Sequence, residues 1–173
     1  MRVFVAIDIP KQTQKEIKKI QGKIPEFKGK FTEAENLHLT LKFLGNIDEE
    51  KIDEIKIRLR NVKLKSFETE INKIGVFSPS FIKIVWIHLT NFEALQKIVD
   101  EKLSSLFPKE KRFMSHLTIA RVKSVENKKE FLEELERIKF PEIKFKVKDF
   151  RLKKSTLSRK GPVYEDLEEY PLE

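Results

Sequence analysis

The feature that most constrains the fold of this chain is an order of elements that occurs twice: strand, helix, strand, helix. In each copy, alternating apolar residues precede a segment whose apolar residues recur at helical spacing, and this pair is then repeated. The expected elements are residues 2–9, 10–24, 37–44 and 48–62, and residues 81–89, 92–106, 116–122 and 126–139. We therefore predict an α+β protein of two pseudo-symmetric lobes, each with an antiparallel sheet and helices on its outer face, and a groove between them.

Three further strands are expected outside the two copies. The alternation in residues 67–77 slips near Asn72, which predicts a bulge. Near the end of the chain, residues 142–152 and 162–170 are expected to be strands joined by the loop "KKSTLSRKG". This loop could bind an RNA backbone or be a plain basic turn. A chain of this length can bury a large core, so we predict one bilobal domain over residues 1–173.

The composition excludes several kinds of chemistry. The chain has no cysteine, so disulfides, thiolate metal sites and thiol nucleophiles are ruled out. The formal net charge of +8 attracts polyanions and favours a nucleic-acid partner, although a solubilised surface would show the same excess. Charged residues make up 37% of the chain, a composition typical of thermophile proteins. No segment is long and apolar enough to suggest a membrane anchor, and we expect a cytoplasmic monomer.

All three histidines of the chain lie in a His-Leu-Thr tripeptide, and two of these tripeptides begin a predicted strand. In a strand, residues two apart share a face, so His38 points the same way as Thr40, and His116 the same way as Thr118. If the lobes face each other, the two pairs line one groove. One imidazole could then take a proton from a nucleophile while the other protonates a leaving oxygen. Threonine hydroxyls could donate to the oxygens of a phosphate.

The third histidine, His88, is expected to have a structural role. The repeat aligns it with Asp8 at the end of a strand, whereas His38 and His116 begin theirs. Thr90 and Glu93 have the spacing of a capping box before the next helix. The alternative is a substrate contact at the edge of the groove.

No metal or cofactor is expected. None of the histidines has a carboxylate at the spacing of a metal motif such as H-E-x-x-H, and the nearby polar groups are hydroxyls. The chain also lacks a glycine-rich phosphate loop, so no nucleoside triphosphate is implied.

The segments "ENLHLTLKFLG" and "HLTIAR" resemble the paired His-x-Thr motifs of the two-histidine (2H) phosphoesterase superfamily. Within it, they are most similar to the bacterial and archaeal 2'-5' RNA ligase-like family, also called RNA 2',3'-cyclic phosphodiesterases. The opening "MRVFVAIDIP" and the tail "STLSRKGPVYEDL" support this resemblance. It implies metal-independent hydrolysis of RNA 2',3'-cyclic phosphate ends to 2'-phosphates, with a possible reversible 2'-5' ligation of tRNA halves.

The resemblance also implies roles for individual residues. His38 would be the proton donor to the 3' oxygen, and His116 the proton acceptor that activates water. Thr40, Thr118 and Arg121 would bind the phosphate. In a regular strand Arg121 points away from His116, so a bulge, the strand end or its long side chain must bring it round. Ser115 stands where the family usually has proline.

Two further residues are candidate substrate contacts. Lys42 shares the expected face of His38 and Thr40, and could hold phosphate or be a solvated lysine. Phe4 shares the expected open face of the first strand, and could stack on a base or pack within the fold. Two alternative functions stay open at this stage: a non-catalytic module that binds RNA ends, and a phosphodiesterase for a small cyclic phosphate such as ADP-ribose cyclic phosphate.

Overall fold

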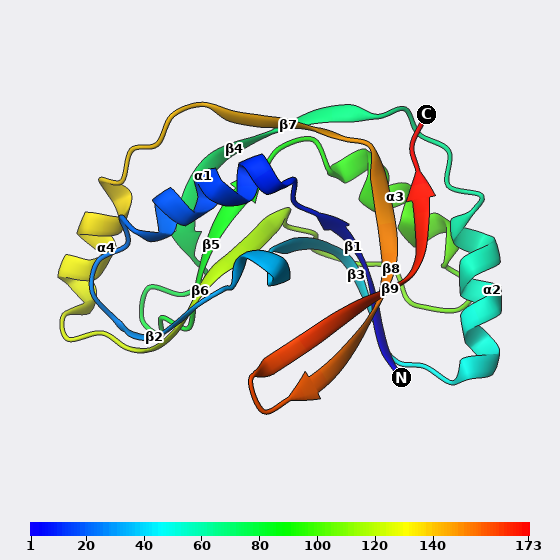
Figure 1. Ribbon diagram of the computed structural model, residues 1–173, viewed down its shortest axis with the longest axis horizontal. Coiled ribbons are helices and arrows are strands. Elements are labelled where there is room, and N and C mark those ends of the chain that lie inside the picture. The colour runs from blue at the N-terminus through cyan, green and yellow to red at the C-terminus, as the bar shows by residue number, and fades with distance from the viewer.

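The computed structural model describes residues 1–173 and contains two antiparallel sheets with four α-helices around them (Figure 1). One sheet has four strands in the order β3-β1-β8-β9, and the other has five in the order β2-β6-β5-β4-β7. The elements are β1 (Arg2–Asp8), α1 (Lys11–Gln21), β2 (Lys28–Phe31), the 3-10 helix η1 (Ala34–Asn36), β3 (His38–Asn46), α2 (Glu49–Leu59), β4 (Phe67–Val76), β5 (Ile84–Leu89), α3 (Glu93–Lys102), β6 (His116–Ser124), α4 (Lys128–Glu136), β7 (Ile143–Val147), β8 (Asp149–Ser158) and β9 (Gly161–Pro171). The prediction of an α+β fold with one antiparallel sheet per lobe is confirmed.

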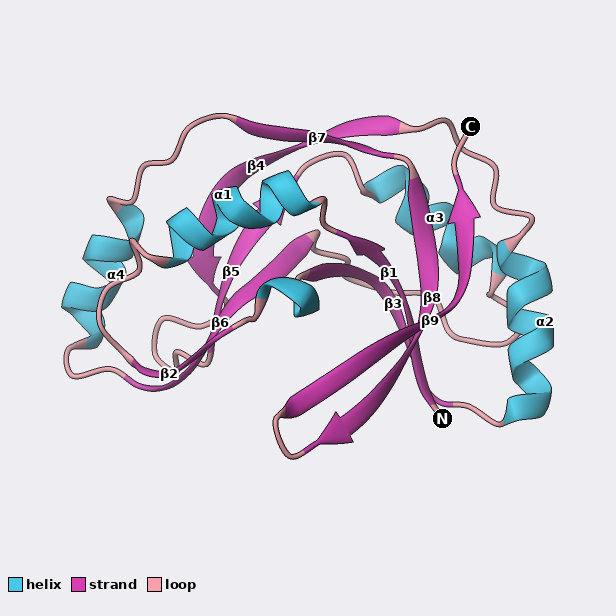
Figure 2. Ribbon diagram, viewed as in Figure 1, coloured by secondary structure: helices cyan, strands magenta, loops and turns pink.

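The two lobes exchange segments rather than following one another along the chain. Strands β8 and β9, from the end of the chain, join β1 and β3 from its beginning. Helix α1 follows β1 but packs on β6 and β7 of the other sheet, while α3 follows β5 but packs on β3. Figure 2 shows α1 and α4 around the five-stranded sheet, and α2 and α3 beside the four-stranded one. A single cluster of 36 buried apolar residues draws on both sheets, so the exchange ties the lobes together.

The end of the chain differs from the sequence-based expectation. Residues 142–152 form two strands that belong to different sheets, because β7 pairs with β4 whereas β8 pairs with β1 and β9. The segment "KKSTLSRKG" is not a loop: it is mostly the outer part of β8, which turns at Arg159 and Lys160 into β9. This β8–β9 hairpin projects from the body of the protein (Figure 1). The short strand β2 was not predicted, since its residues show no apolar alternation.

Three strand irregularities matter for the site. The expected bulge near Asn72 is confirmed by a register shift between Ile71 and Lys73. Two others were not expected: opposite β1, strand β3 has an extra residue at Leu41, and opposite β5, strand β6 has an extra residue at Ile119. No helix of the protein combines the length and apolarity needed to cross a bilayer.

Candidate active site

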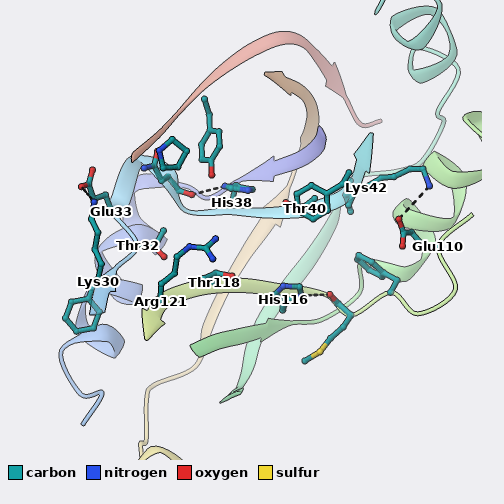
Figure 3. A pocket seen from close by; sticks show the side chains of 18 of the residues that line it. Lys30, Thr32, Glu33, His38, Thr40, Lys42, Glu110, His116, Thr118 and Arg121 are labelled. Carbon is teal, nitrogen blue, oxygen red and sulfur yellow. Dashed lines mark hydrogen bonds and ion pairs between the residues drawn. The ribbon is translucent and has the colours of Figure 1, made fainter. Parts of the chain in front are cut away.

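A groove of about 410 Å³ lies between the two sheets, where strands β3 and β6 contact each other (Figure 3). The two strands run in opposite directions along it, so Arg121 lies toward one end and Glu110 toward the other. The groove-lining residues that the argument uses are Lys30, Thr32, His38, Thr40, Phe43, Glu110, Arg112, Phe113, Met114, His116, Thr118, Arg121 and Tyr164. The structure thus brings both predicted His/Thr pairs and Arg121 into one cavity.

Strands β3 and β6 have the same backbone design. Residue by residue, the nine positions of the two strands show the same sequence of buried, half-buried and exposed side chains. In both strands a bulge follows the threonine, so two consecutive residues turn toward the core instead of one. The next side chain therefore returns to the groove face, and in β6 that side chain is Arg121. The bulge explains how Arg121 reaches the face of His116.

The bulge of β6 is held by hydrogen bonds from outside the ladder. The carbonyl oxygen of Ile119 accepts hydrogen bonds from the backbone N–H of Thr32, at 3.0 Å, and from the side-chain amide of Gln21, at 2.9 Å. Gln21 is buried in helix α1, and its amide also donates to the Thr32 carbonyl. Because these donors satisfy a carbonyl that strand pairing leaves free, helix α1 fixes the position of the bulge and hence of Arg121.

Both groove histidines are held by the same hydrogen bond. Nδ1 of His38 lies 2.8 Å from the carbonyl oxygen of Asn36, and Nδ1 of His116 lies 2.9 Å from that of Met114. A carbonyl oxygen can only accept, so each Nδ1 carries the proton and donates it. In the neutral form of each ring, Nε2 is then the free acceptor. Each imidazole is thereby fixed in the tautomer that can exchange a proton through Nε2.

An aromatic ring packs edge-on against each of these imidazoles. The centroid of the Tyr164 ring lies 4.8 Å from that of His38, with an angle of 78° between the planes. Phe77 meets His116 in the same way, at 4.9 Å and 89°. Sequence reasoning missed both residues, since Tyr164 lies on β9 and Phe77 follows β4, far in the chain from the motifs. Such contacts restrict the rotation of the imidazoles.

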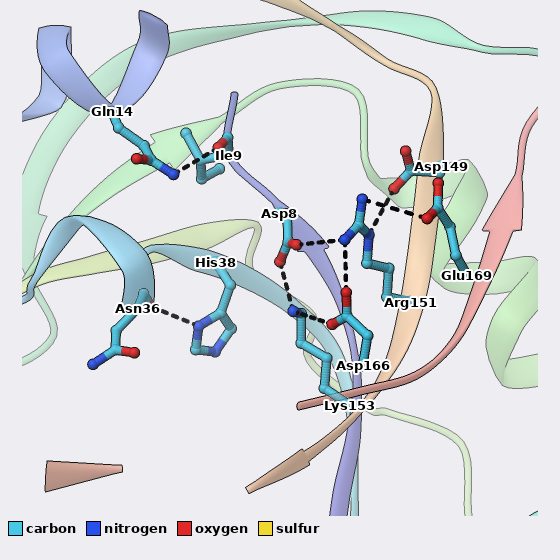
Figure 4. Close-up of polar contacts among 10 residues, drawn as sticks. All are labelled: Asp8, Ile9, Gln14, Asn36, His38, Asp149, Arg151, Lys153, Asp166 and Glu169. Carbon is cyan, nitrogen blue, oxygen red and sulfur yellow. Dashed lines mark hydrogen bonds and ion pairs between the residues drawn. The ribbon is translucent and has the colours of Figure 1, made fainter. Parts of the chain in front are cut away.

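A network of charged side chains lies beside the half-buried His38. Beside it, Asp8 accepts from Lys153 at 2.8 Å and from Arg151 at 3.0 Å, and Asp166 binds the same two cations (Figure 4). Burial lowers the pKa of His38 below its ordinary value, and the positive charges of Lys153 and Arg121 lower it further. The hydrogen bond to Asn36 and the charge of Asp8 act in the opposite direction.

Lys42 lines the groove, but its ammonium group is neither solvated nor free to hold a phosphate. The bulge turns its side chain inward, where its ammonium group donates to the carboxylate of Asp100 at 2.5 Å and to the carbonyl of Pro108 at 2.7 Å. The residue is only 2% exposed. The same carboxylate accepts from the backbone N–H of Glu110, so Lys42 and Asp100 anchor the segment that leads into β6.

Phe4 lies on the predicted face but is not free to stack on a base. Its side chain is 3% exposed and packs against His38, Tyr164 and Phe43. The open face of β1 is closed at this point by these rings. Phe4 therefore packs against the imidazole of His38 and supports it.

His88 is paired with His116 across the β5–β6 ladder, as Asp8 is paired with His38 across β1 and β3. This register confirms that the repeat places His88 opposite a groove histidine and in the position of Asp8. Its Nδ1 lies 2.7 Å from the side-chain oxygen of Asn72, and His88 does not line the groove. The predicted capping box is wrong, because the Thr90 hydroxyl accepts from the backbone N–H of Glu70 instead.

The groove presents cations without internal partners. Arg121 and Arg112 have no carboxylate within 4.0 Å, whereas Lys30 is paired with Glu33 at 3.2 Å. No three side chains of His, Asp, Glu or Cys gather where they could hold a metal ion. Together with two hydroxyls and two imidazoles, the free guanidinium groups make a site suited to an anion such as a phosphodiester.

The fold and these two His/Thr pairs define a two-histidine phosphoesterase. The chain belongs to the LigT-like phosphoesterase family, whose profile matches residues 7–86 and 89–164. It is therefore a phosphoesterase, and an enzyme is favoured over the non-catalytic RNA-end-binding module.

Relatives of known name and structure match nearly the whole chain. The RNA 2',3'-cyclic phosphodiesterase of Methanocaldococcus jannaschii is 42% identical, over 98% of this chain and 100% of the relative. That of Thermotoga maritima is 36% identical, over 100% and 96%. The crystal structure of TT0787 of Thermus thermophilus superposes with a TM-score of 0.80 at 26% identity, over 99% and 97%. Escherichia coli LigT complexed with phosphate has the same fold, with a TM-score of 0.75 at 24% identity, over 99% and 96%.

Proposed function

We propose that this enzyme hydrolyses RNA 2',3'-cyclic phosphate ends to 2'-phosphates, without a metal ion, by acid–base catalysis between His38 and His116. The observation that carries the proposal is the matched pair of imidazoles, each of which keeps Nδ1 on a carbonyl and leaves Nε2 to exchange a proton. The curated relatives are named for this activity. The net charge of +8 suits an RNA substrate.

The reaction needs two proton transfers at one phosphorus atom. Nε2 of His116 takes a proton from water as the water oxygen forms a bond to phosphorus. The bond between phosphorus and the ribose 3' oxygen breaks, and that oxygen takes the proton from Nε2 of His38. The product is a 2'-phosphate with a free 3'-hydroxyl, and a proton exchange between the two histidines through solvent restores the starting state.

Three side chains bind the phosphate in this proposal. The hydroxyls of Thr40 and Thr118 donate hydrogen bonds to the non-bridging oxygens, where negative charge is concentrated in the transition state. Arg121 supplies a cation that has no competing carboxylate in the chain. Their position on two facing strands fixes the phosphate between the imidazoles, so the acid and the base approach it from opposite sides.

Substrate binding prepares His38 for its role as the acid. In the free enzyme, burial lowers the pKa of His38, which favours the neutral ring. A bound phosphodiester places a negative charge beside the ring and raises its pKa, so the imidazolium forms when the substrate is present. We therefore expect binding of the substrate to be coupled to uptake of a proton.

The same site accounts for a reversible 2'-5' ligation. If the 5'-hydroxyl of a second RNA replaces water, His116 takes its proton, and the 5' oxygen becomes bonded to phosphorus. The 3' oxygen leaves as before with the proton from His38. No nucleoside triphosphate is consumed, because the strained cyclic phosphate supplies the leaving group. Two tRNA halves are the kind of substrate that this reaction would join.

Alanine variants in a cyclic-nucleotide assay that contains EDTA test this proposal. We expect His38→Ala and His116→Ala each to lose about 10²-fold or more in rate, the size typical of losing a general acid or base. The matched control is His88→Ala, which should stay within about threefold of the wild type because His88 lies outside the groove.

Loss of activity in EDTA, or a His88 variant as impaired as the His116 variant, would contradict the proposal. Rates on an RNA end and on ADP-ribose cyclic phosphate, measured side by side, distinguish an RNA substrate from a small cyclic phosphate.

A further inference from the structure

The matched strands β3 and β6 differ at the one side chain that follows the bulge on the groove face. In β6 this side chain is Arg121, whereas in β3 it is Phe43. Phe43 lines the groove and is 72% exposed, although it belongs to a strand whose other large apolar residues are buried. A cation at one position and an exposed aromatic ring at its equivalent give the pseudo-symmetric groove two unlike ends.

The two ends lie on opposite sides of the proposed phosphate position. Figure 3 shows Arg121 with Lys30 and Thr32 at one end, and Glu110 beyond Thr40 and His116 at the other. Phe43 follows Lys42 on β3 and so lies toward the Glu110 end, within about 10 Å of strand from Thr40. A nucleoside linked to a phosphate between the imidazoles spans a distance of this order.

We propose that the Phe43 end of the groove is a second nucleobase subsite, which binds the nucleoside on the side of the phosphate where the attacking hydroxyl enters. This inference rests on the proposed function, in which His116 activates that hydroxyl. The occupant is the first nucleoside of an RNA with a free 5'-hydroxyl. The site is then built to hold two nucleosides across one phosphate, and not only a cyclic phosphate end.

The composition of this end fits a base better than a second anion. Phe113 and Met114, which directly precede β6, are half-buried and add apolar side chains to the lining of the groove. Arg112, which has no internal carboxylate partner, also lines the groove and lies two residues after Glu110 in the chain, so we expect it to bind the next phosphate of the strand. Aromatic rings interleaved with cations are the usual way in which proteins hold single-stranded RNA, because every base has a face to stack.

An isolated exposed phenylalanine would not support this inference, because scattered apolar residues are common on protein surfaces. Phe81 is such a residue: it is 64% exposed, contacts Lys83 and does not line the groove. Phe43 differs because its position is fixed by a bulge of β3 that is equivalent to the bulge of β6 that turns Arg121 into the groove. Phe81 therefore provides a matched control.

Binding of an unreactive ligand tests the subsite independently of turnover. The ligand is a 2'-5'-linked dinucleotide whose first sugar lacks the 3'-hydroxyl, so that the linkage cannot cyclise. Its partner ligand is the same compound without the second base. By calorimetry, we expect the wild-type enzyme to bind the complete dinucleotide about tenfold more tightly, in line with base–aromatic stacking. Phe43→Ala should reduce this preference to about twofold or less, while Phe43→Trp and Phe81→Ala should keep it.

An equal affinity of the wild type for the two ligands would overturn the inference, as would a preference that Phe43→Ala retains. A preference lost equally in Phe81→Ala would also overturn it, since the effect would then not belong to the groove. Failure of the proposed function would appear elsewhere, as an absence of turnover on cyclic nucleotides, and would leave these affinities unaffected.

Discussion

Strands β3 and β6 have the same backbone and different surroundings. Both place a histidine, a threonine, a bulge and a groove-facing residue in the same order, and both hold the imidazole through Nδ1. Around β3, however, an acidic and basic network reaches His38 through Asp8 and Lys153. At the position of Asp8, β5 carries His88 instead, bound to Asn72. The equal geometry allows either histidine to donate or accept a proton. The unequal electrostatic surroundings can make one histidine the acid and the other the base.

The inner side of the bulge shows the same contrast. Position 42 of β3 is a lysine buried in an ion pair with Asp100, whereas its equivalent in β6 is Ala120, buried among apolar residues. The ion pair joins β3 to the segment that precedes His116, since Asp100 also accepts from the N–H of Glu110. Burial raises the pKa of Asp100, but its bonds to Lys42, Glu110 and Gln96 outweigh this and hold the pKa below its ordinary value.

The largest expected effect comes from removing the buried charge at position 42 of β3, so that this position becomes apolar like position 120 of β6. Lys42→Met leaves the Asp100 carboxylate buried without its cation, and should lower the free energy of unfolding by about 3–5 kcal/mol. The double variant Lys42→Met/Asp100→Leu removes both charges, and should recover most of that loss. Denaturant unfolding monitored by circular dichroism measures both. If Lys42→Met were as stable as the wild type, the ion pair would not be what holds β3 to the segment that precedes His116.

The second prediction tests whether the two histidines have separate directions. Bis(p-nitrophenyl) phosphate has no sugar hydroxyl that could attack, so water is the nucleophile, as in the proposed reaction. The p-nitrophenolate that leaves opposite the water needs no proton at neutral pH, so the acid becomes dispensable while the base does not. His38→Ala should therefore lose about 10²-fold on a cyclic nucleotide, but less than about tenfold on bis(p-nitrophenyl) phosphate. His116→Ala should lose about 10²-fold on both. The reverse pattern would exchange the assignment of acid and base without affecting the pair itself.

Sequence reasoning placed His38 and His116 in their groove because their spacing was repeated, and repetition is visible without knowledge of long-range pairing. The same reasoning failed four residues after His38, at Lys42. In "HLTLKF" apolar and polar residues alternate without a break, so Lys42 was expected on the face of His38 and Phe43 on the opposite face with Leu39 and Leu41. The bulge reverses both, and it arises from pairing with β1, which the local sequence does not encode.

Other features could not be predicted for the same physical reason. The edge-on rings of Tyr164 and Phe77 reach the imidazoles from β9 and from the end of β4, across sheet contacts between distant parts of the chain. The exchange of helices between lobes depends on which sheet each apolar stripe covers, and a helical stripe does not specify its partner. In contrast, Arg121 was recognised as a problem of strand phase, and the bulge that solves it is the one repeated in β3.

The smallest expected effect concerns the charged groups around His38, which make the surroundings of β3 differ from those of β6. The charged groups that act on His38 are Lys153, Asp8 and Arg121, and Tyr164 packs against its ring. Because burial lowers the pKa of His38, its imidazolium is lost at a lower pH than that of an ordinary histidine, and the alkaline limb of kcat/KM should lie below about 6.5.

Asp8→Asn removes a charge that raises this pKa and should move the limb to lower pH, whereas Lys153→Met should move it to higher pH, each by less than about one pH unit. Lys160→Met, on the exposed hairpin, is the control for loss of one positive charge and should leave the limb in place. With only three histidines in the chain, NMR titration of the free protein can follow His38 directly. If both variants moved the limb in the same direction, the limb would report the pKa of a group other than His38. The charges around β3 would then not control the catalytic acid.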